Sequence, residues 1–210
     1  MPRVTALRPR GRDSVAVELD DRPWRELPGD ALVRAGVREG LELDRERLRL
    51  LRRELRRSEA LAVAGRTLRR RAASRQELEV RLARAHVPPS ARADALALLT
   101  ASGLVDDERL ASATAEALAG RGYGDAAVIF RLERLGLSEG VARGACARLD
   151  PETRRAAGIV EARGRSQRTA AYLARRGFSA DSIEDAVGTS LADETVEGYD
   201  NGSSSDIFPA

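Results

Sequence analysis

Residues 131–137 read RLERLGL, and this stretch has the form of a helix end. Leu132 belongs to a predicted buried face, arginines lie around it, and Gly136 stands before one more apolar residue. Glycine fits the left-handed conformation that ends many helices, and the apolar residue after it packs back onto the helix. Ser138 is then a suitable cap for another helix. The stretch therefore predicts two helices joined by a tight turn.

Two more stretches repeat this form: residues 81–87 read RLARAHV, and residues 173–178 read LARRGF. Both are followed by residues that can start another helix, Pro88-Pro89-Ser90 and Ser179. Counted from their leucines, the three helix ends are 50 and then 41 residues apart, which argues against a strict solenoid. Read backwards from each end, the apolar pattern predicts three three-helix units, at residues 58–103, 104–150 and 151–191.

The chain before these repeats is expected to begin with a flexible basic lead at residues 1–13, which contains arginines and prolines without periodicity. A small β/α segment is predicted at residues 14–57. Asp44 caps a helix in this segment that begins at Arg45. The helix either breaks at Ser58 or continues into the first three-helix unit.

Three stretches of the β/α segment are candidate strands. Apolar and polar residues alternate over Ser14–Leu19, as in a half-buried strand. A second extended piece is expected at Trp24–Leu27, before Pro28–Gly29 breaks it, and Ala31–Val33 is the third candidate. Trp24 is expected to anchor a small core.

The predicted fold is therefore mainly all-α: an elongated tandem array of three three-helix units, preceded by a small N-terminal β-hairpin-like segment and a helix. Composition agrees, because Ala, Leu, Arg and Glu favour helix and only 3% of the residues are aromatic. No stretch approaches the roughly 18 apolar residues of a membrane span, and no apolar signal-peptide core follows the Arg-rich start. A cytoplasmic location is expected.

The charge is divided between a basic body and an acidic tail. The formal net charge is +3, and all 36 basic residues are arginines. Residues 181–210 contain eight acids and no base, so residues 1–180 carry a net charge of +11. Residues 192–210 are expected to be a disordered acidic tail. It either solvates the chain, offers a short peptide ligand around Asp206-Ile207-Phe208, or masks the basic body.

Residues that catalysis or metal binding would need are scarce. Cys146 lies in an apolar helical pattern and is expected to be a small buried side chain, and His86 is the single histidine. No nucleophile with a base, metal-ligand cluster or cofactor loop is recognisable. The chain is therefore predicted to be no enzyme and to bind no metal or cofactor.

Several motifs, in their order and spacing, resemble the RecX family of regulatory proteins. They are the helix start at Ser74–Leu78, residues 103–111 (GLVDDERLA), residues 121–124 (RGYG) and the helix ends at 132–137 and 173–178. The resemblance covers about residues 40–190, with a looser fit from Val15. His86 departs from the pattern of glycines, so its turn is expected to be less tightly shaped. The acidic tail is not part of the family pattern.

The resemblance implies a monomeric regulator of the recombinase RecA. Such a protein binds in the groove of the RecA–DNA filament, blocks strand exchange and ATP turnover, and promotes disassembly. It acts in recombinational DNA repair and the SOS response. The candidate interface with RecA or DNA consists of one tyrosine and arginines that recur near helix ends: Arg84, Arg121, Tyr123, Arg131, Arg134, Arg175 and Arg176. The other interpretation of each arginine is a solvated helix face.

Two motifs carry further expectations from their chemistry. Asp106 and Asp107 are expected to cap the helix that follows them. Gly122 and Gly124 are expected to end one helix and admit the turn to the next. Tyr123 between them is either a contact residue or a side chain packed over a junction.

The alternative function is a helical protein that binds nucleic acid directly, without sequence specificity. Three-helix units can resemble helix-turn-helix domains, and the body is strongly basic. Sequence-specific reading of bases is disfavoured because Asn and Gln occur only at Asn201, Gln76 and Gln167. Phosphate contacts predict a steep loss of binding with salt.

Overall fold

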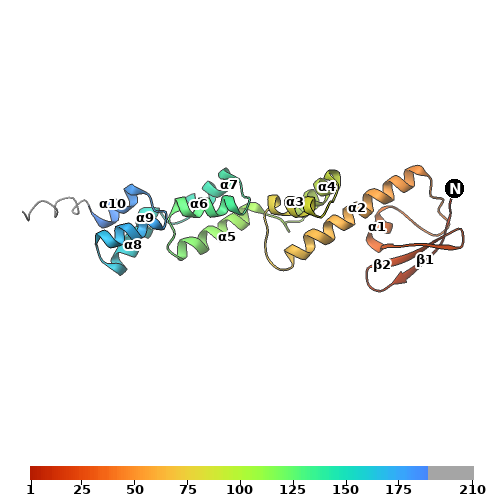
Figure 1. Cartoon of the computed structure of the whole chain (residues 1–210), viewed down its shortest axis with the longest axis horizontal. Coiled ribbons are helices and arrows are strands. Elements are labelled where there is room, and N and C mark those ends of the chain that lie inside the picture. Colours follow the sequence, from red (N-terminus) through yellow and green to blue (C-terminus); the bar gives the residue numbers. More distant parts are fainter. Residues whose placement is uncertain (189–210) are drawn as a thin grey trace, which may run out of the picture. The chain divides into compact units, whose positions relative to one another are not determined.

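Figure 1 shows the computed structural model of the chain, which describes residues 1–188. Contacts divide these residues into two compact bodies. The N-terminal body contains residues 1–110 and 135–137, and the C-terminal body contains residues 111–134 and 138–188. The tail expected at residues 192–210 lies outside the described residues.

The N-terminal body begins with an antiparallel sheet in the order β1-β2-β3. Its strands are β1 (Val4–Arg10), β2 (Ser14–Leu19) and β3 (Arg22–Pro28). β2 confirms the predicted strand, and β3 contains the predicted second piece. Val17 and Leu27 are buried in a core between this sheet and the helices that follow.

Strand β1 corrects the prediction of a flexible lead at residues 1–13. The pairing of β1 with β2 shifts at a bulge between Val4 and Ala6. A bulge inserts one residue and so changes which side chains share a face. Val4 and Leu7 consequently pack on the same core, three residues apart. This odd spacing hides the strand from a search for strict alternation.

Two further expectations for this segment are wrong. Ala31–Val33 is not a strand but part of helix α1 (Gly29–Arg34), in which Leu32 is buried and Val33 is exposed. Trp24 does not anchor a core: it is 37% exposed, in the edge strand β3, whose residues 22–26 are all exposed.

Helix α2 (Arg45–Leu68) begins after Asp44, whose carboxylate accepts a hydrogen bond from the backbone N–H of Arg47 at 2.7 Å. The helix continues unbroken through Ser58, so the boundary expected between residues 57 and 58 lies inside one helix. Ser58 donates its hydroxyl to Asp30 at 3.0 Å and does not cap a new helix.

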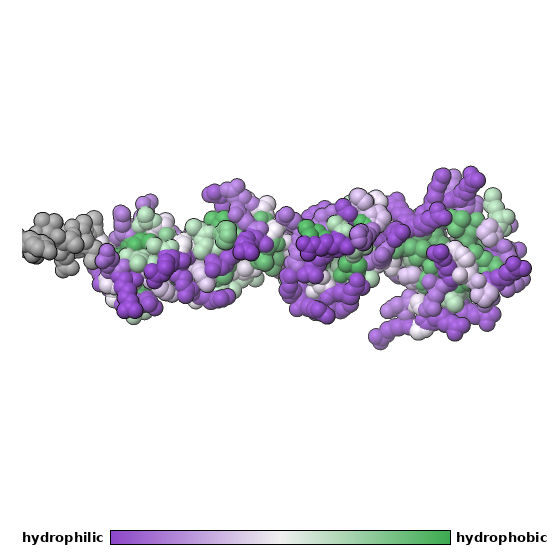
Figure 2. Space-filling view, in the orientation of Figure 1, coloured by the Kyte–Doolittle hydropathy of each residue, from purple (hydrophilic) through white to green (hydrophobic). Residues whose placement is uncertain are grey.

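Two cores share α2. Its first half packs on the sheet and α1 through Leu51. Its second half packs on α3 (Arg75–Arg84) and α4 (Pro89–Ala101), as Figure 1 shows. Leu78 and Leu82 are fully buried in this second core, and each such leucine stabilises the fold by about 1.5–3 kcal/mol. On the face drawn in Figure 2, hydrophilic side chains cover most of the surface.

The remaining helices belong mainly to the C-terminal body. The first of them, α5, begins in the N-terminal body and belongs to the C-terminal body from Ala111 on. They are α5 (Asp107–Gly120), α6 (Asp125–Arg134), α7 (Glu139–Ala147), α8 (Glu152–Arg163), α9 (Gln167–Arg175) and α10 (Ala180–Val187). Helix α6 packs on α7, and α10 packs on α8 and α9. Cys146 is buried in α7, as predicted. A mainly helical chain with a small N-terminal sheet is confirmed.

The three helix ends marked by the sequence have one backbone form. His86, Gly136 and Gly177 have φ angles of +57°, +82° and +81°. After His86, the backbone N–H of Val87 donates to the carbonyl of Leu82 at 3.1 Å. After Gly177, the N–H of Phe178 donates in the same way to the carbonyl of Leu173 at 3.2 Å. The expectation of a looser turn at His86 is wrong, since histidine tolerates this conformation better than most residues.

Candidate functional site

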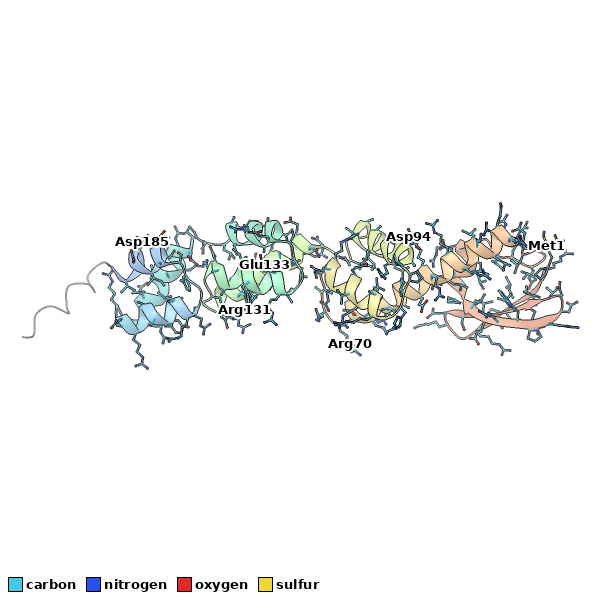
Figure 3. All side chains as sticks on the ribbon, turned by 45° about the horizontal axis from the view of Figure 1, so that its top comes forward. Met1, Arg70, Asp94, Arg131, Glu133 and Asp185 are labelled. Carbon is cyan, nitrogen blue, oxygen red and sulfur yellow. The ribbon has the colours of Figure 1, made fainter. Side chains whose placement is uncertain are left out.

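Arginines from three segments surround the ring of Tyr123, which stands in the turn between α5 and α6. The guanidinium carbon of Arg131 lies 3.9 Å from the ring centroid, that of Arg176 4.6 Å and that of Arg121 5.8 Å. Arg131 comes from α6 (Figure 3). A guanidinium over an aromatic face is favourable by about 0.5–2 kcal/mol, depending on its exposure. Tyr123 therefore holds several cationic groups in one place.

Tyr172 of α9 extends this arrangement. The guanidinium carbon of Arg176 lies 5.1 Å from its ring centroid, and that of Arg163 lies 4.1 Å from it. Both tyrosines are half-buried, while Arg163 and Arg121 are exposed. We call these residues the Tyr–Arg cluster: Arg121, Tyr123, Arg131, Arg163, Tyr172 and Arg176.

Two turns support the cluster by bonding to each other. The backbone N–H of Gly124 donates to the carbonyl of Arg176 at 3.0 Å, and Nη1 of Arg176 donates to the carbonyl of Arg121 at 3.0 Å. A Cβ atom on Gly124 would overlap the backbone of Gly177. The absence of side chains at both glycines thus permits the close approach that brings Tyr123 and Arg176 together.

A half-buried arginine holds the turn of Tyr123. Arg155, whose side chain is 13% exposed, donates Nη1 to the carbonyl of Tyr123 at 2.8 Å and forms an ion pair with Asp125. Its Nε donates to the carbonyl of Asp150 at 3.0 Å. Arg155 thus fixes the turn through the Tyr123 carbonyl and Asp125.

Glu152 connects the starts of α6 and α10. Its Oε1 accepts the backbone N–H of Asp125 at 2.6 Å, and its Oε2 accepts the backbone N–H of Ser179 at 3.1 Å. The hydroxyls of Ser179 and Ser182 donate to the same Oε2 at 2.7 and 3.0 Å. One carboxylate therefore caps the N-terminal ends of two helices, where a negative charge is favourable.

The two acids of this network have opposite pKa shifts. Burial alone would raise the pKa of Glu152, but hydrogen bonds from Ser179, the Asp125 N–H and Ser182 outweigh it and hold that pKa below its usual range. Burial raises the pKa of Asp125, the charge of Glu152 adds to the effect, and Arg155 offsets only part of it. The network thus depends on Glu152 being ionised.

The structure brings together four of the predicted interface residues: Arg121, Tyr123, Arg131 and Arg176. Arg134 lies outside the cluster, with its guanidinium carbon 5.9 Å from the ring of Phe130, which is 58% exposed. Arg175 is exposed at the end of α9. Arg84 belongs to the N-terminal body and lines a separate groove there.

Sequence reasoning missed Arg163 and Tyr172. Tyr172 stands four residues before Arg176, a spacing that places two side chains on one face of a helix, so this partner was recognisable. Arg163 comes from a different helix, and no local spacing connects it to Tyr172.

The aspartates after α4 have separate roles. Asp106 accepts the backbone N–H of Arg109 at 2.9 Å, which confirms it as a cap of α5. Asp107 instead accepts the backbone N–H of Arg75, the first residue of α3, at 2.9 Å.

Within residues 1–188, no group of His, Cys, Asp and Glu is placed to hold a metal ion. Over the same range, no helix has the length and apolarity to span a membrane.

The fold resembles solved structures of one family. A crystal structure of regulatory protein RecX matches with a TM-score of 0.74 at 16% identity and covers 89% of this chain and 98% of its own. A crystal structure of RecX from Lactobacillus salivarius matches with a TM-score of 0.56 at 15% identity, covering 63% of this chain and 94% of its own.

Sequence relatives agree. Regulatory protein RecX of Halorhodospira halophila is 34% identical over 151 residues, which cover 67% of this chain and 92% of the relative. Regulatory protein RecX of Mycolicibacterium smegmatis is 32% identical over 156 residues, covering 66% of this chain and 83% of the relative. No family model matches the sequence. At this identity and coverage, the chain belongs to the RecX family of regulatory proteins.

Proposed function

We propose that this chain is a cytoplasmic, monomeric regulator that binds the RecA–DNA filament and inhibits strand exchange and ATP turnover. It acts without catalysis, in recombinational DNA repair and the SOS response. Membership of the RecX family supports the regulatory role. The observation that carries the contact itself is the Tyr–Arg cluster.

The cluster has the properties of a protein-binding surface. Tyrosine and arginine, together with tryptophan, are the residue types most enriched where binding energy concentrates. Stacking on Tyr123 and Tyr172 restricts the arginines before a partner arrives, which lowers the conformational entropy lost on binding. Arg121 and Arg163 remain exposed, and a guanidinium can bond a carboxylate or a phosphate through two parallel hydrogen bonds.

Arg134 and Arg175 belong to the same proposed surface. Arg134 is the last residue of α6, three positions after Arg131 in the cluster, and Arg175 directly precedes Arg176. The exposed ring of Phe130 adds an apolar contact beside Arg134. Three three-helix units, at residues 58–103, 104–150 and 151–191, would allow one chain to contact several recombinase subunits.

A titration of RecA ATPase on single-stranded DNA tests this function. We expect strong inhibition at few molecules of this chain per filament. We also expect the half-inhibitory concentration to rise at least tenfold in a variant with Arg131, Arg134, Arg175 and Arg176 changed to alanine. The matched control carries the same change at four exposed arginines of the N-terminal body: Arg22, Arg45, Arg49 and Arg52.

Folding is separated from binding in the same experiment. Arg131 and Arg176 pack on Tyr123, so their loss can loosen the C-terminal body. The double variant Arg134→Ala, Arg175→Ala leaves that packing in place and is expected to retain the native circular dichroism. Unchanged inhibition by a folded quadruple variant would contradict the proposal.

Direct binding to nucleic acid is the second candidate, and the adjacency of tyrosine rings and arginines in the cluster favours it. Such surfaces bind single strands through phosphate contacts and stacking. Affinity for a bare oligonucleotide should then fall with salt, with about one unit of log–log slope for each phosphate neutralised. Negligible affinity for bare DNA, beside salt-insensitive affinity for filaments, would exclude it.

A further inference from the structure

A second arginine-rich surface lies in the N-terminal body, in a groove between the end of α2 and α3. The groove has a volume of about 830 Å³. We call it the Arg groove, after the arginines that line it: Arg66, Arg70, Arg71, Arg81 and Arg84. Arg70 follows the end of α2 (Figure 3). This groove is separate from the Tyr–Arg cluster, whose residues all belong to the C-terminal body.

Only part of the positive charge in the groove is neutralised. Glu77, also in its lining, accepts hydrogen bonds from Nη2 of Arg71 at 2.6 Å and from Nε of Arg81 at 2.9 Å. The lining thus carries a net charge of +4. Arg66, Arg70 and Arg84 are exposed, and no ion pair involves them within residues 1–188. The groove therefore offers guanidinium groups to an anionic partner.

The groove is also partly apolar. Val63 and Val80 line it, and Val80 is 42% exposed. No aromatic ring of the described residues lines it, so the bases of a single strand would find no stacking surface there. A peptide that combines carboxylates with apolar side chains fits both the charge and the valines.

This chain carries such a peptide. Residues 189–210 contain no base and five acids: Asp193, Glu194, Glu197, Asp200 and Asp206. Apolar residues are interspersed with the acids, among them Val196, Tyr199 and Phe208. A stretch of this length spans up to about 70–80 Å when extended. We propose that the Arg groove is the docking site of this acidic C-terminal segment, which covers the groove arginines when bound.

A contact of this kind is reversible and sensitive to salt. Exposed charges are screened beyond about 8 Å at physiological ionic strength. The segment therefore competes with other anionic ligands for the groove. None of this requires RecA, so the proposal stands or falls separately from the proposed function.

The test uses a fluorescent peptide of residues 189–210 and the full-length chain with its own five tail acids changed to Asn or Gln. Anisotropy is expected to show binding at low salt. The dissociation constant is expected to rise at least tenfold when Arg66, Arg70 and Arg84 are changed to glutamate. The control, with the exposed Arg45, Arg49 and Arg52 of α2 changed to glutamate, is expected to bind like the parent.

The native chain supplies the second comparison. Because its own tail occupies the groove, it is expected to bind the peptide at least fivefold more weakly than the chain with the neutralised tail. Equal affinity of the two chains would overturn the proposal. So would a groove that binds a labelled oligonucleotide but not the peptide, because the occupant would then be nucleic acid.

Folding does not confound the result. The three arginines are exposed, and the variant Arg66→Gln, Arg70→Gln, Arg84→Gln removes their charge without reversing it. This variant is expected to keep the native circular dichroism and to weaken peptide binding as well. Full peptide affinity in the folded glutamine variant would contradict the assignment of the groove.

Discussion

Gly177 and His86 end equivalent helices in the two bodies, and their turns have the same left-handed backbone. Their surroundings differ. A Cβ atom on Gly177 would lie 2.6 Å from Cβ and 2.7 Å from N of Ala127, at the start of α6. His86 is exposed and carries a full side chain in the same conformation. The backbone angle therefore does not demand glycine; the close approach of another helix does.

Gly136 supports this interpretation from the N-terminal body, to which residues 135–137 belong. A Cβ there would meet Oγ of Ser74 and Cβ of Gln76, each at 3.0 Å, at the start of α3. Ser74 also donates its hydroxyl to the carbonyl of Leu135 at 2.5 Å. In both bodies a glycine turn thus packs against the start of a helix that precedes it in the chain.

Among the substitutions by alanine, the largest effect is expected for Gly177→Ala. The positive φ costs an alanine about 1–2 kcal/mol, and overlap with the backbone of Ala127 adds overpacking strain of about 1–3 kcal/mol. The free energy of unfolding should fall by about 3 kcal/mol or more, measured by urea denaturation.

Gly158→Ala is the matched control in the same body, since Gly158 lies within α8 with no atom near its Cβ position. It should stabilise the chain by about 0.5–1 kcal/mol. A loss below about 1 kcal/mol for Gly177→Ala would show that this contact is not tight.

The second largest effect is expected for Glu152→Ala. This carboxylate also holds the turn after Gly177, because it accepts the backbone N–H of Ser179. The substitution removes the acceptor for Asp125 N–H and for both serine hydroxyls. Ser179 is exposed, but the Asp125 N–H and the Ser182 hydroxyl are partly buried donors. Leaving such donors unsatisfied costs about 1–3 kcal/mol, so a loss of about 2 kcal/mol is expected in urea denaturation. Glu161→Ala, at an exposed position of the same helix, should change stability by less than about 0.5 kcal/mol.

The pH dependence of the same contact has a defined sign. The pKa of Glu152 is lower in the folded chain than its usual value of 4.5, so its ionised form stabilises the fold. This contribution is complete above pH 4.5 and is lost as pH falls through the lower folded pKa. The stability gap between the native chain and Glu152→Gln should therefore be largest near pH 7 and narrow in acid. A gap that widens below pH 4.5 would contradict this sign.

Gly136→Ala should have an intermediate effect. Its φ carries the same cost as at Gly177, but the near neighbours are side-chain atoms, and one of them, Oε1 of Gln76 at 3.2 Å, can move away. A loss of about 1.5–2 kcal/mol is expected in urea denaturation. Combining Gly136→Ala with Gln76→Ala should recover part of it, and a purely additive double variant would show that Gln76 does not oppose the methyl group.

The helix ends were predictable because their signals are local. Leu132, Gly136 and Ser138 lie within seven residues, and the structure places a helix end, a positive φ and a cap there. Strand β1 was not predictable in this way, since its bulge shifts the apolar spacing. The sequence does not decide whether α2 continues through Ser58, because serine either caps a helix or, as here, bonds to a distant Asp30.

In the candidate site, too, local signals were predictable and contacts between distant segments were not. Tyr123 and Arg131 were recognisable from a turn and a helix end close in sequence. The contact of Arg176 with Tyr123 bridges 53 positions, and it depends on the approach of Gly124 and Gly177, which only the tertiary structure shows. The sequence thus marked four residues of the Tyr–Arg cluster but did not show that they meet.

The smallest effect is expected for His86→Gly. Glycine relieves the strain of a left-handed histidine, but it also gives the unfolded chain more conformational freedom, and each contribution is about 0.5–1 kcal/mol. The free energy of unfolding should therefore stay within about 0.5 kcal/mol of the native value. Gly177→His, the reverse exchange at the equivalent packed turn, should prevent the C-terminal body from forming, as a loss of the circular dichroism of its helices would show. If both exchanges proved equally mild, the packing of Ala127 against Gly177 would not be what distinguishes the two turns.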